Sequence, residues 1–133
     1  MDINFSQSKR HRATVIVECS EGILLTETYD KQVLLPGGGI NRRELPIAAA
    51  ARELMEETGL TAVSLTFLFQ HESASTYHHV YYAVTHGTPI AQDDALRILY
   101  FDAATTSVMP KMSPATHRIL EKFKKIGCGD ETG

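Results

Sequence analysis

The chain has 133 residues, of which 43% are hydrophobic and 22% are charged, a composition typical of one globular domain large enough to bury a core. Its formal net charge of −3 argues against general nucleic-acid binding, which usually needs a basic surface. We expect neither a signal peptide nor a membrane span, and the two cysteines form no metal-binding pattern. We therefore expect a single cytoplasmic domain over residues 1–133, as a monomer or homodimer, with no nucleic-acid or membrane partner.

The N-terminal third predicts three strands. Residues 13–19 and 22–27 are rich in aliphatic and β-branched side chains, and the short polar segment between them predicts a hairpin. A third strand over residues 32–35 leads into three glycines at 37–39, which predict a flexible turn whose backbone a ligand can approach closely. The basic run over residues 9–12 is interpreted as a solvated lead-in to the first strand, with a phosphate contact as the alternative.

A helix is expected next, over residues 46–58. Pro46 suits the first helical position, and Gly59 suits a left-handed stop at the other end. Leu45 stands where a capping side chain is common, so the first helical amides would depend on Glu44 or on water. The helical period predicts that the face packed on the sheet consists of Ile47, Ala51, Leu54, Met55 and Thr58.

The same helix carries a stripe of carboxylates. Glu53, Glu56 and Glu57 are neighbours on one side because their spacings are three and four residues. Their mutual repulsion is removed by a divalent cation, and Mg²⁺ prefers hard oxygen ligands that it shares with phosphates. Arg52 lies next to this stripe and can orient a carboxylate. A solvated acidic surface is the alternative, but the glycines and charged residues at fixed distances favour a metal site.

The second half predicts three more strands and a closing helix. Adjacent His78 and His79 lie in one of these strands, so one should face inward and the other outward. Ser113 and Pro114 form a start signal for the closing helix, and the glycine-rich end, residues 127–133, predicts a flexible tail. The strands cover residues 63–70, 78–85 and 96–101, and the helix should face the sheet with Ala115, Ile119, Leu120 and Phe123.

Residues 38–60 follow the pattern G-x5-E-x7-R-E-L-x-E-E-x-G-L without a missed position. This pattern resembles the signature box of the Nudix (MutT-like) hydrolases, which act on nucleoside diphosphates linked to a further group X. The resemblance implies an α/β fold in which a mixed β-sheet lies between α-helices and the box forms a loop–helix–loop. The matching positions are Gly38, Glu44, Arg52, Glu53, Leu54, Glu56, Glu57, Gly59 and Leu60.

The resemblance also implies roles for these residues. The three box carboxylates would be ligands of Mg²⁺ or Mn²⁺, joined by the backbone carbonyl of Gly38 or Gly37. Arg52 would hold a catalytic glutamate, and Glu44 would support the site from the loop. Water would attack a phosphorus of the pyrophosphate bridge. The ligand carboxylates are Glu53, Glu56 and Glu57.

The box does not choose the substrate. A compact chain of this kind is most similar to enzymes that hydrolyse nucleoside triphosphates, including oxidised ones. The alternative substrates are dinucleoside polyphosphates, for which Tyr77 would stack on a base, and ADP-ribose or nucleotide sugars. The alternative to an enzyme is a module that senses a nucleotide without cleaving it. Asp94 is the preferred candidate for a general base or an extra ligand outside the box, ahead of Glu72 and Asp93.

Overall fold

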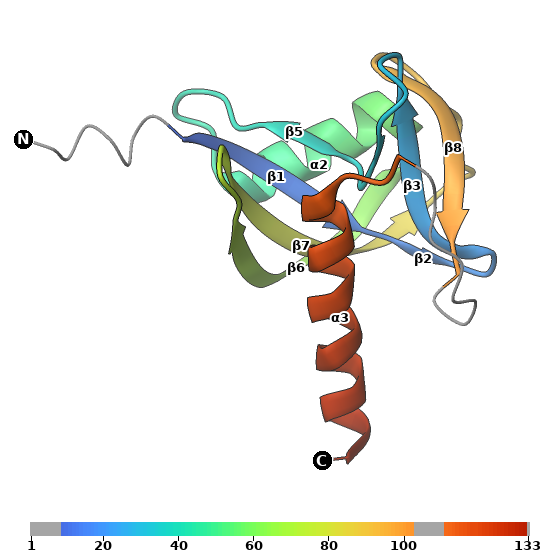
Figure 1. Ribbon diagram of the computed structural model, residues 1–133. Helices are drawn as coiled ribbons and strands as arrows, with labels where there is room; N and C mark the ends of the chain where they lie inside the picture. Colours follow the sequence, from blue (N-terminus) through green and yellow to red (C-terminus); the bar gives the residue numbers. More distant parts are fainter. Residues whose placement is uncertain (1–8, 103–110, 133) are drawn as a thin grey trace, which may run out of the picture.

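The computed structural model describes residues 9–102 and 111–132 (Figure 1). Two four-stranded sheets and two helices make up this part of the chain. The strands are β1 (Arg10–Ile16), β2 (Glu18–Cys19), β3 (Gly22–Thr28), β4 (Val33–Leu34), β5 (Gly37–Gly39), β6 (Thr61–Glu72), β7 (Thr76–His86) and β8 (Ala95–Phe101). The helices are α2 (Pro46–Thr58) and α3 (Pro114–Thr132).

The first sheet is mixed and has the strand order β5-β1-β7-β6. Its central pair, β1 and β7, is parallel, whereas β5 pairs with β1 and β6 pairs with β7 in the antiparallel sense. Parallel pairing needs a long crossover connection, and here the crossover between β1 and β7 contains α2. The expected α/β fold with a mixed sheet and flanking helices is confirmed.

The second sheet is built around β3, which pairs with β2, β4 and β8. The expected hairpin is present between β2 and β3, with Glu18 opposite Ile23 and Cys19 opposite Gly22. The strand predicted over residues 13–19 is divided, because the chain leaves the first sheet after Ile16 and enters the second at Glu18. Strands expected in one sheet are therefore shared between two.

Helix α2 has the expected bounds. It starts at Pro46, directly after Leu45, which makes no side-chain capping hydrogen bond. Glu44 does not supply the cap either, since its carboxylate accepts hydrogen bonds from the backbone N–H of Asn41 and from Arg52. The helix ends at Gly59, whose φ of 74° is left-handed and whose N–H donates to the Met55 carbonyl over 2.9 Å.

The face of α2 that packs on the sheet is rotated from the predicted one. Leu54 and Thr58 are fully buried as expected, but Ile47 and Met55 are each 43% exposed, so the prediction for these two side chains was wrong. Ala49 and Ala50 are fully buried in their place. Small side chains let the helix backbone lie close to the sheet, and this rotation turns the carboxylate stripe toward β5.

Helix α3 starts with a side-chain cap, since the Ser113 hydroxyl accepts a hydrogen bond from the Thr116 N–H over 3.1 Å. Ile119 and Leu120 are buried as expected, and the Phe123 ring stacks on Tyr82 with 5.9 Å between centroids. The flexible tail expected from residue 127 is corrected, because α3 continues to Thr132. A glycine costs a helix only about 1 kcal/mol. Residue 133 lies outside the described residues.

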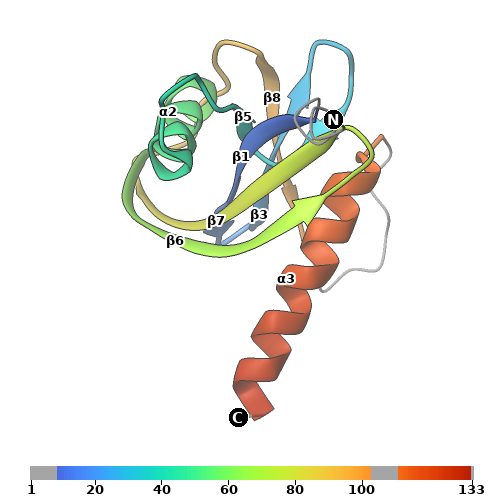
Figure 2. The ribbon, with the colours of Figure 1, turned by 90° about the vertical axis from the view of Figure 1, so that its left-hand side faces the viewer.

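The two helices lie on opposite sides of the first sheet, as Figure 2 shows. One core cluster packs α2 against β1 and β7 through residues such as Ala13, Val15 and Leu54, and a second cluster packs α3 against Ile16 and Val80. Within the described residues, no helix combines the length and the hydrophobicity needed to cross a membrane.

Candidate active site

The three glycines form an edge strand, not the flexible turn that we expected. β5 pairs antiparallel with β1, so that Gly37 lies opposite Thr14 and Gly38 opposite Ala13. A Cβ at Gly37 would overlap the Ala13 carbonyl, and a Cβ at Gly38 would overlap the carboxylate of Glu53. Pairing with β1 fixes the backbone here. Glycine is required at position 37 by the β1 backbone and by its own φ of 152°, and at position 38 by the Glu53 side chain, whereas a Cβ at Gly39 would meet nothing within 4 Å.

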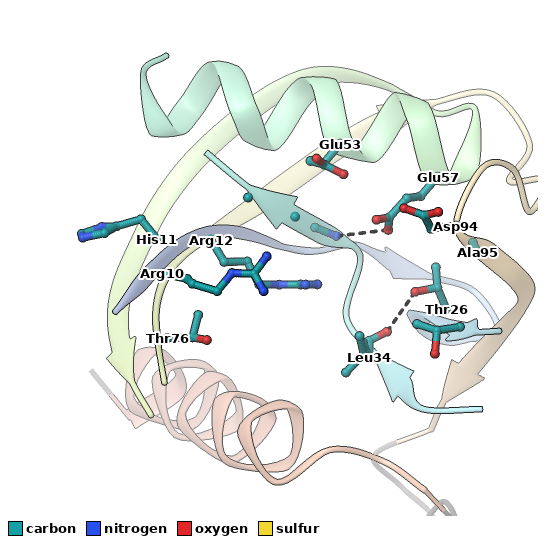
Figure 3. A pocket seen from close by; sticks show the side chains of 14 residues that line it. Arg10, His11, Arg12, Thr26, Leu34, Glu53, Glu57, Thr76, Asp94 and Ala95 are labelled. Atoms are coloured by element: carbon teal, nitrogen blue, oxygen red, sulfur yellow. Dashed lines mark hydrogen bonds between the residues drawn. The ribbon is translucent and has the colours of Figure 1, made fainter. Parts of the chain in front are cut away.

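A cavity of about 350 Å³ lies along this glycine edge. Glu53 and Glu57 of α2 reach into it, and Figure 3 shows both carboxylates directed toward β5. Residues of the second sheet, among them Thr26 and Leu34, line the cavity from another direction. Without side chains, β5 leaves its backbone open to groups that arrive from both faces of the first sheet.

Burial sets the protonation of Glu57. Desolvation raises its pKa to about 7 from an ordinary 4.5, and the negative charge of Glu53 acts in the same direction. The Gly37 N–H donates to Glu57 Oε1 over 3.2 Å and, together with the charge of Arg12, opposes this rise. A carboxyl group with a pKa near neutrality in a cavity is typical of a functional site. A positive charge placed beside it would favour its ionised form.

Arg52 ties the carboxylates of α2 to the loop before the helix. Its Nε and Nη2 donate to the two oxygens of Glu44 over 2.8 and 2.9 Å, a bidentate pair. Its Nη1 donates to Glu53 over 3.0 Å and to Glu56 over 3.3 Å, and Nη2 also donates to the Gly39 carbonyl over 3.1 Å. The bond from Arg52 holds the pKa of Glu44 down at about 2. Glu44 therefore stays ionised and keeps Arg52 against Glu53.

Basic side chains line the cavity from β1. Arg10, His11 and Arg12 all belong to its lining, and Figure 3 shows the two arginines on the other side of β5 from the glutamates. Burial lowers the pKa of Arg12, whereas the charges of Glu57 and Glu53 raise it. The solvated lead-in that we expected for residues 9–12 is corrected, since three of its members are part of a strand that borders the cavity.

Asp94 is brought to the same cavity by backbone bonds between its loop and the end of α2. The Gln92 N–H donates to the Glu57 carbonyl over 2.9 Å, and the Ile90 N–H donates to the Thr58 carbonyl over 2.9 Å. These bonds place Asp94 in the lining beside Glu57 (Figure 3). The cavity thus combines three acidic side chains with a basic wall and an open glycine backbone.

A family model of the NUDIX domain matches residues 9–123 of the chain. The chain belongs to the Nudix family. Diphosphoinositol polyphosphate phosphohydrolase 2 of Rattus norvegicus is 30% identical over 125 residues, which cover 87% of this chain and 69% of that protein. The "Putative 8-oxo-dGTP diphosphatase YtkD" of Bacillus subtilis is 39% identical over 71 residues, which cover 53% of this chain and 44% of that protein.

Solved structures of similar proteins support the assignment to the Nudix family. A crystal structure of a nudix hydrolase family member from Chromobacterium violaceum superposes with a TM-score of 0.80 and 33% identity, covering 88% of this chain and 77% of that one. The solution structure of the E. coli ORF135 protein has a TM-score of 0.74 at 22% identity, covering 93% and 95% of the two chains, and supports the fold alone. The chain is a Nudix hydrolase.

Not all of the predicted site residues of this Nudix hydrolase lie together. Glu56 is 43% exposed, does not line the cavity and is turned to Arg52. Within residues 9–102 and 111–132, no three His, Cys, Asp or Glu side chains are grouped closely enough to hold a metal ion. Arg52 explains this arrangement, because it draws one oxygen each of Glu53 and Glu56 to itself. The three-carboxylate ligand set stays a prediction.

Of the candidate site residues predicted outside the box, some line the cavity and others do not. Asp94 lines the cavity, but Glu72 forms an ion pair with Lys9 and is not part of the lining, and neither is Asp93. Tyr77 does not line the cavity; its ring lies 5.1 Å from the ring of His11, which does. The role of Tyr77 as a base-stacking residue stays a prediction.

Sequence reasoning gave the basic run over residues 9–12 only the alternative of a phosphate contact, and it missed the threonines of the cavity wall. Arg12 lies on one face of β1 with Thr14, and Thr26 and Thr28 project from β3 into the cavity. For β1 the sequence carries one signal, because Arg12 and Thr14 alternate with Ala13 and Val15. Thr26 and Thr28 show no such alternation, since Glu27 lies between them. The alternation in β1 indicates a polar face, but it does not tell which cavity the face borders.

Proposed function

We propose that this Nudix hydrolase is a Mg²⁺-dependent pyrophosphohydrolase that cleaves a nucleoside diphosphate linked to a further group, with a (d)NTP as the preferred substrate class. The observation that carries the proposal is the cavity at β5, where Glu53 and Glu57 face an open glycine backbone opposite two arginines. Carboxylate oxygens are suitable ligands for a hard cation such as Mg²⁺, and guanidinium groups bind phosphate oxygens. Hydrolysis of a pyrophosphate would use the cation and the guanidinium groups together.

The residues of the cavity fit a divalent cation. Glu53 and Glu57 supply carboxylate oxygens, and the Gly37 and Gly38 carbonyls are the backbone oxygens proposed beside them. The space that a Cβ of Gly38 would fill is taken by the Glu53 carboxylate, so the backbone and this side chain approach each other as shared ligation requires. Glu56 is the third proposed ligand, reached when its bond to Arg52 is released. A bound Mg²⁺ would neutralise charge on the phosphates and lower the pKa of a bound water.

The chain's own residues would share the remaining tasks. Arg10 and Arg12 would bind the phosphate oxygens and set the position of the pyrophosphate bridge. Arg52, held by Glu44, would keep the Glu53 carboxylate in place. Asp94 is the candidate to accept the proton of the attacking water, because it lies in the cavity beside Glu57 and comes from a loop attached to α2.

The triphosphate class is supported by the compact chain and by similarity to a relative named as an 8-oxo-dGTP diphosphatase. A more highly phosphorylated substrate is the second candidate. It is favoured by the basic lining of Arg10, His11 and Arg12, and by similarity to a diphosphoinositol polyphosphate phosphohydrolase over most of the chain. Dinucleoside polyphosphates would depend on Tyr77, whose ring lies beside His11.

A turnover screen tests the proposal. The panel contains (d)NTPs and their oxidised forms, dinucleoside polyphosphates, ADP-ribose, nucleotide sugars and a diphosphoinositol polyphosphate, each with Mg²⁺. We expect the highest kcat/KM with a triphosphate, giving a nucleoside monophosphate and pyrophosphate. A lead of about tenfold or more in kcat/KM for any other class, which corresponds to 1.4 kcal/mol, would refute the triphosphate assignment. Binding without cleavage would indicate a sensing module.

A further inference from the structure

A buried polar chain runs from the cavity into the sheet. Arg12 Nε donates to the hydroxyl oxygen of Thr14 over 3.2 Å, and this oxygen lies 2.9 Å from Nδ1 of His78. Thr14 is 1% exposed and His78 is 9% exposed. All three side chains lie on the face of the sheet that carries α3, since β1 and β7 are paired in parallel register there. Nothing in the proposed hydrolysis uses Thr14 or His78 directly.

The chemistry of the three side chains fixes which group donates and which accepts in each of these hydrogen bonds. A guanidinium can only donate, so the Thr14 oxygen accepts from Arg12. The hydroxyl proton of Thr14 then needs an acceptor, because a buried donor without one is costly. His78 Nδ1 provides it when the imidazole is neutral. Burial and the charge of Arg12 lower the pKa of His78 to about 4, which keeps the imidazole neutral near pH 7.

Arg12 has a competing set of partners that would disable the site. The charges of Glu57 and Glu53 attract its guanidinium. Arg52, which is not part of the cavity lining, already donates to Glu53 over 3.0 Å, so this carboxylate accepts a guanidinium as a partner. Arg12 is held away from these carboxylates by Thr14 on one side and by the Leu35 carbonyl, which accepts from its Nη2 over 2.8 Å, on the other. Its Nη1 makes no hydrogen bond to a described residue.

We propose that Thr14 and His78 are positioning residues for substrate binding: they hold the Arg12 guanidinium toward the phosphate part of the cavity and away from Glu53 and Glu57. This inference rests on the proposed function, in which Arg12 binds phosphate oxygens. His78 acts through Thr14 and does not touch the substrate. If the contact of Arg12 with phosphate is equally strong in the bound substrate and in the transition state, weakening it raises KM and leaves kcat unchanged.

The alternative is that the Thr14–His78 bond only stabilises the sheet, and kinetics separate the two. Thr14→Val keeps the branched shape and removes the hydroxyl, whereas Thr14→Ser keeps the hydroxyl. We expect Thr14→Val to raise KM for the best substrate of the panel by roughly threefold to tenfold, the range of one hydrogen bond, with kcat within about twofold. Thr14→Ser should restore the wild-type KM. An unchanged KM in a folded Thr14→Val protein would overturn the proposal.

A double-mutant cycle gives the second readout. In an Arg12→Met background, Thr14→Val should cause no further rise in KM, because the group that it orients is gone. Equal effects in both backgrounds would contradict the positioning role. The Thr14–His78 hydrogen bond can also be removed from the side of His78. His78→Phe should raise KM as Thr14→Val does, and His78→Asn, which keeps an acceptor near Nδ1, should recover part of the wild-type affinity.

Binding of inorganic pyrophosphate with Mg²⁺, measured by calorimetry, separates this inference from the proposed function. If the wild-type protein cleaves nothing in the panel, the proposed function fails. The inference then still predicts that Thr14→Val weakens pyrophosphate binding by roughly threefold to tenfold while Thr14→Ser does not. Equal affinity of the wild type and Thr14→Val, or no pyrophosphate binding by the wild type, would overturn the inference.

Discussion

Replacing Glu57 with glutamine should make the metal-free protein more stable while it destroys the site. In the folded protein desolvation raises the pKa of Glu57 to about 7 from 4.5, so the ionised carboxylate is disfavoured where it lies. Glutamine has the same shape without the charge, and its Oε1 can still accept the hydrogen bond that the Gly37 N–H donates to Glu57 over 3.2 Å. The native carboxylate therefore lowers the stability of the metal-free protein, a cost that the proposed cation would offset.

The sign and size of the effect follow from proton linkage. Between the unfolded pKa and the folded pKa the folded state holds a proton that the unfolded state has lost, so the free energy of unfolding falls as pH rises from 4.5 to about 7. At 1.36 kcal/mol per pKa unit, the rise from 4.5 to about 7 corresponds to a loss of free energy of unfolding of at most about 3–4 kcal/mol above neutral pH. Glu57→Gln removes this loss, and below pH 4.5 it should change little.

Urea denaturation of wild-type protein and Glu57→Gln, in EDTA at pH 8 and at pH 4.5, measures the effect. We expect the variant to be more stable by about 1–3 kcal/mol at pH 8 and equal to the wild type at pH 4.5. With Mg²⁺ at pH 8 the order should reverse, since the cation stabilises only a protein that binds it. The reasoning would be refuted if the variant were less stable than the wild type at pH 8 in EDTA. It would also be refuted if the difference in free energy of unfolding between the two proteins were the same at both pH values.

Two further predictions concern the surroundings of the carboxylates. Gly38→Ala should displace the Glu53 carboxylate that its Cβ would overlap and lower kcat by roughly tenfold or more, whereas Gly39→Ala, with nothing within 4 Å of the new Cβ, should keep wild-type turnover; equal kinetics of the two variants would contradict the packing argument. Glu44→Gln should lower kcat by about 10–100-fold, because Arg52 loses its bidentate partner. Steady-state kinetics check this value, and a loss as large as that of a ligand variant would show that Glu44 has a more direct role.

Local signals in the sequence predicted the box helix and its ends. Pro46 and Gly59 mark the two ends of α2 in the structure, and both act through the backbone, where sequence is informative. The rotation of the helix was not predictable from its period. Ile47 and Met55 lie on the apolar side of the helix, but the sheet is approached through Ala49 and Ala50. Which side of an apolar stripe is buried depends on the partner surface.

The glycine strand and the basic wall required tertiary structure. Three successive glycines predict freedom of the backbone, yet pairing with β1 turns them into a regular edge strand. Arg12 enters the cavity because that strand has no side chains to exclude it, and Asp94 enters it because its loop is bonded to the end of α2. These contacts join segments that are distant in the sequence, so a pattern within one segment could not reveal them.

The most direct test of the account is the dependence of hydrolysis on Mg²⁺ in wild-type protein and in Glu53→Gln. Initial rates with the preferred substrate are measured as Mg²⁺ is varied, with excess EDTA as the metal-free condition. We expect the wild-type rate to rise with Mg²⁺ and to vanish in EDTA, and Glu53→Gln to reduce kcat by about a hundredfold or more at saturating Mg²⁺. Full turnover in excess EDTA, or a wild-type rate for Glu53→Gln, would contradict a metal site on α2.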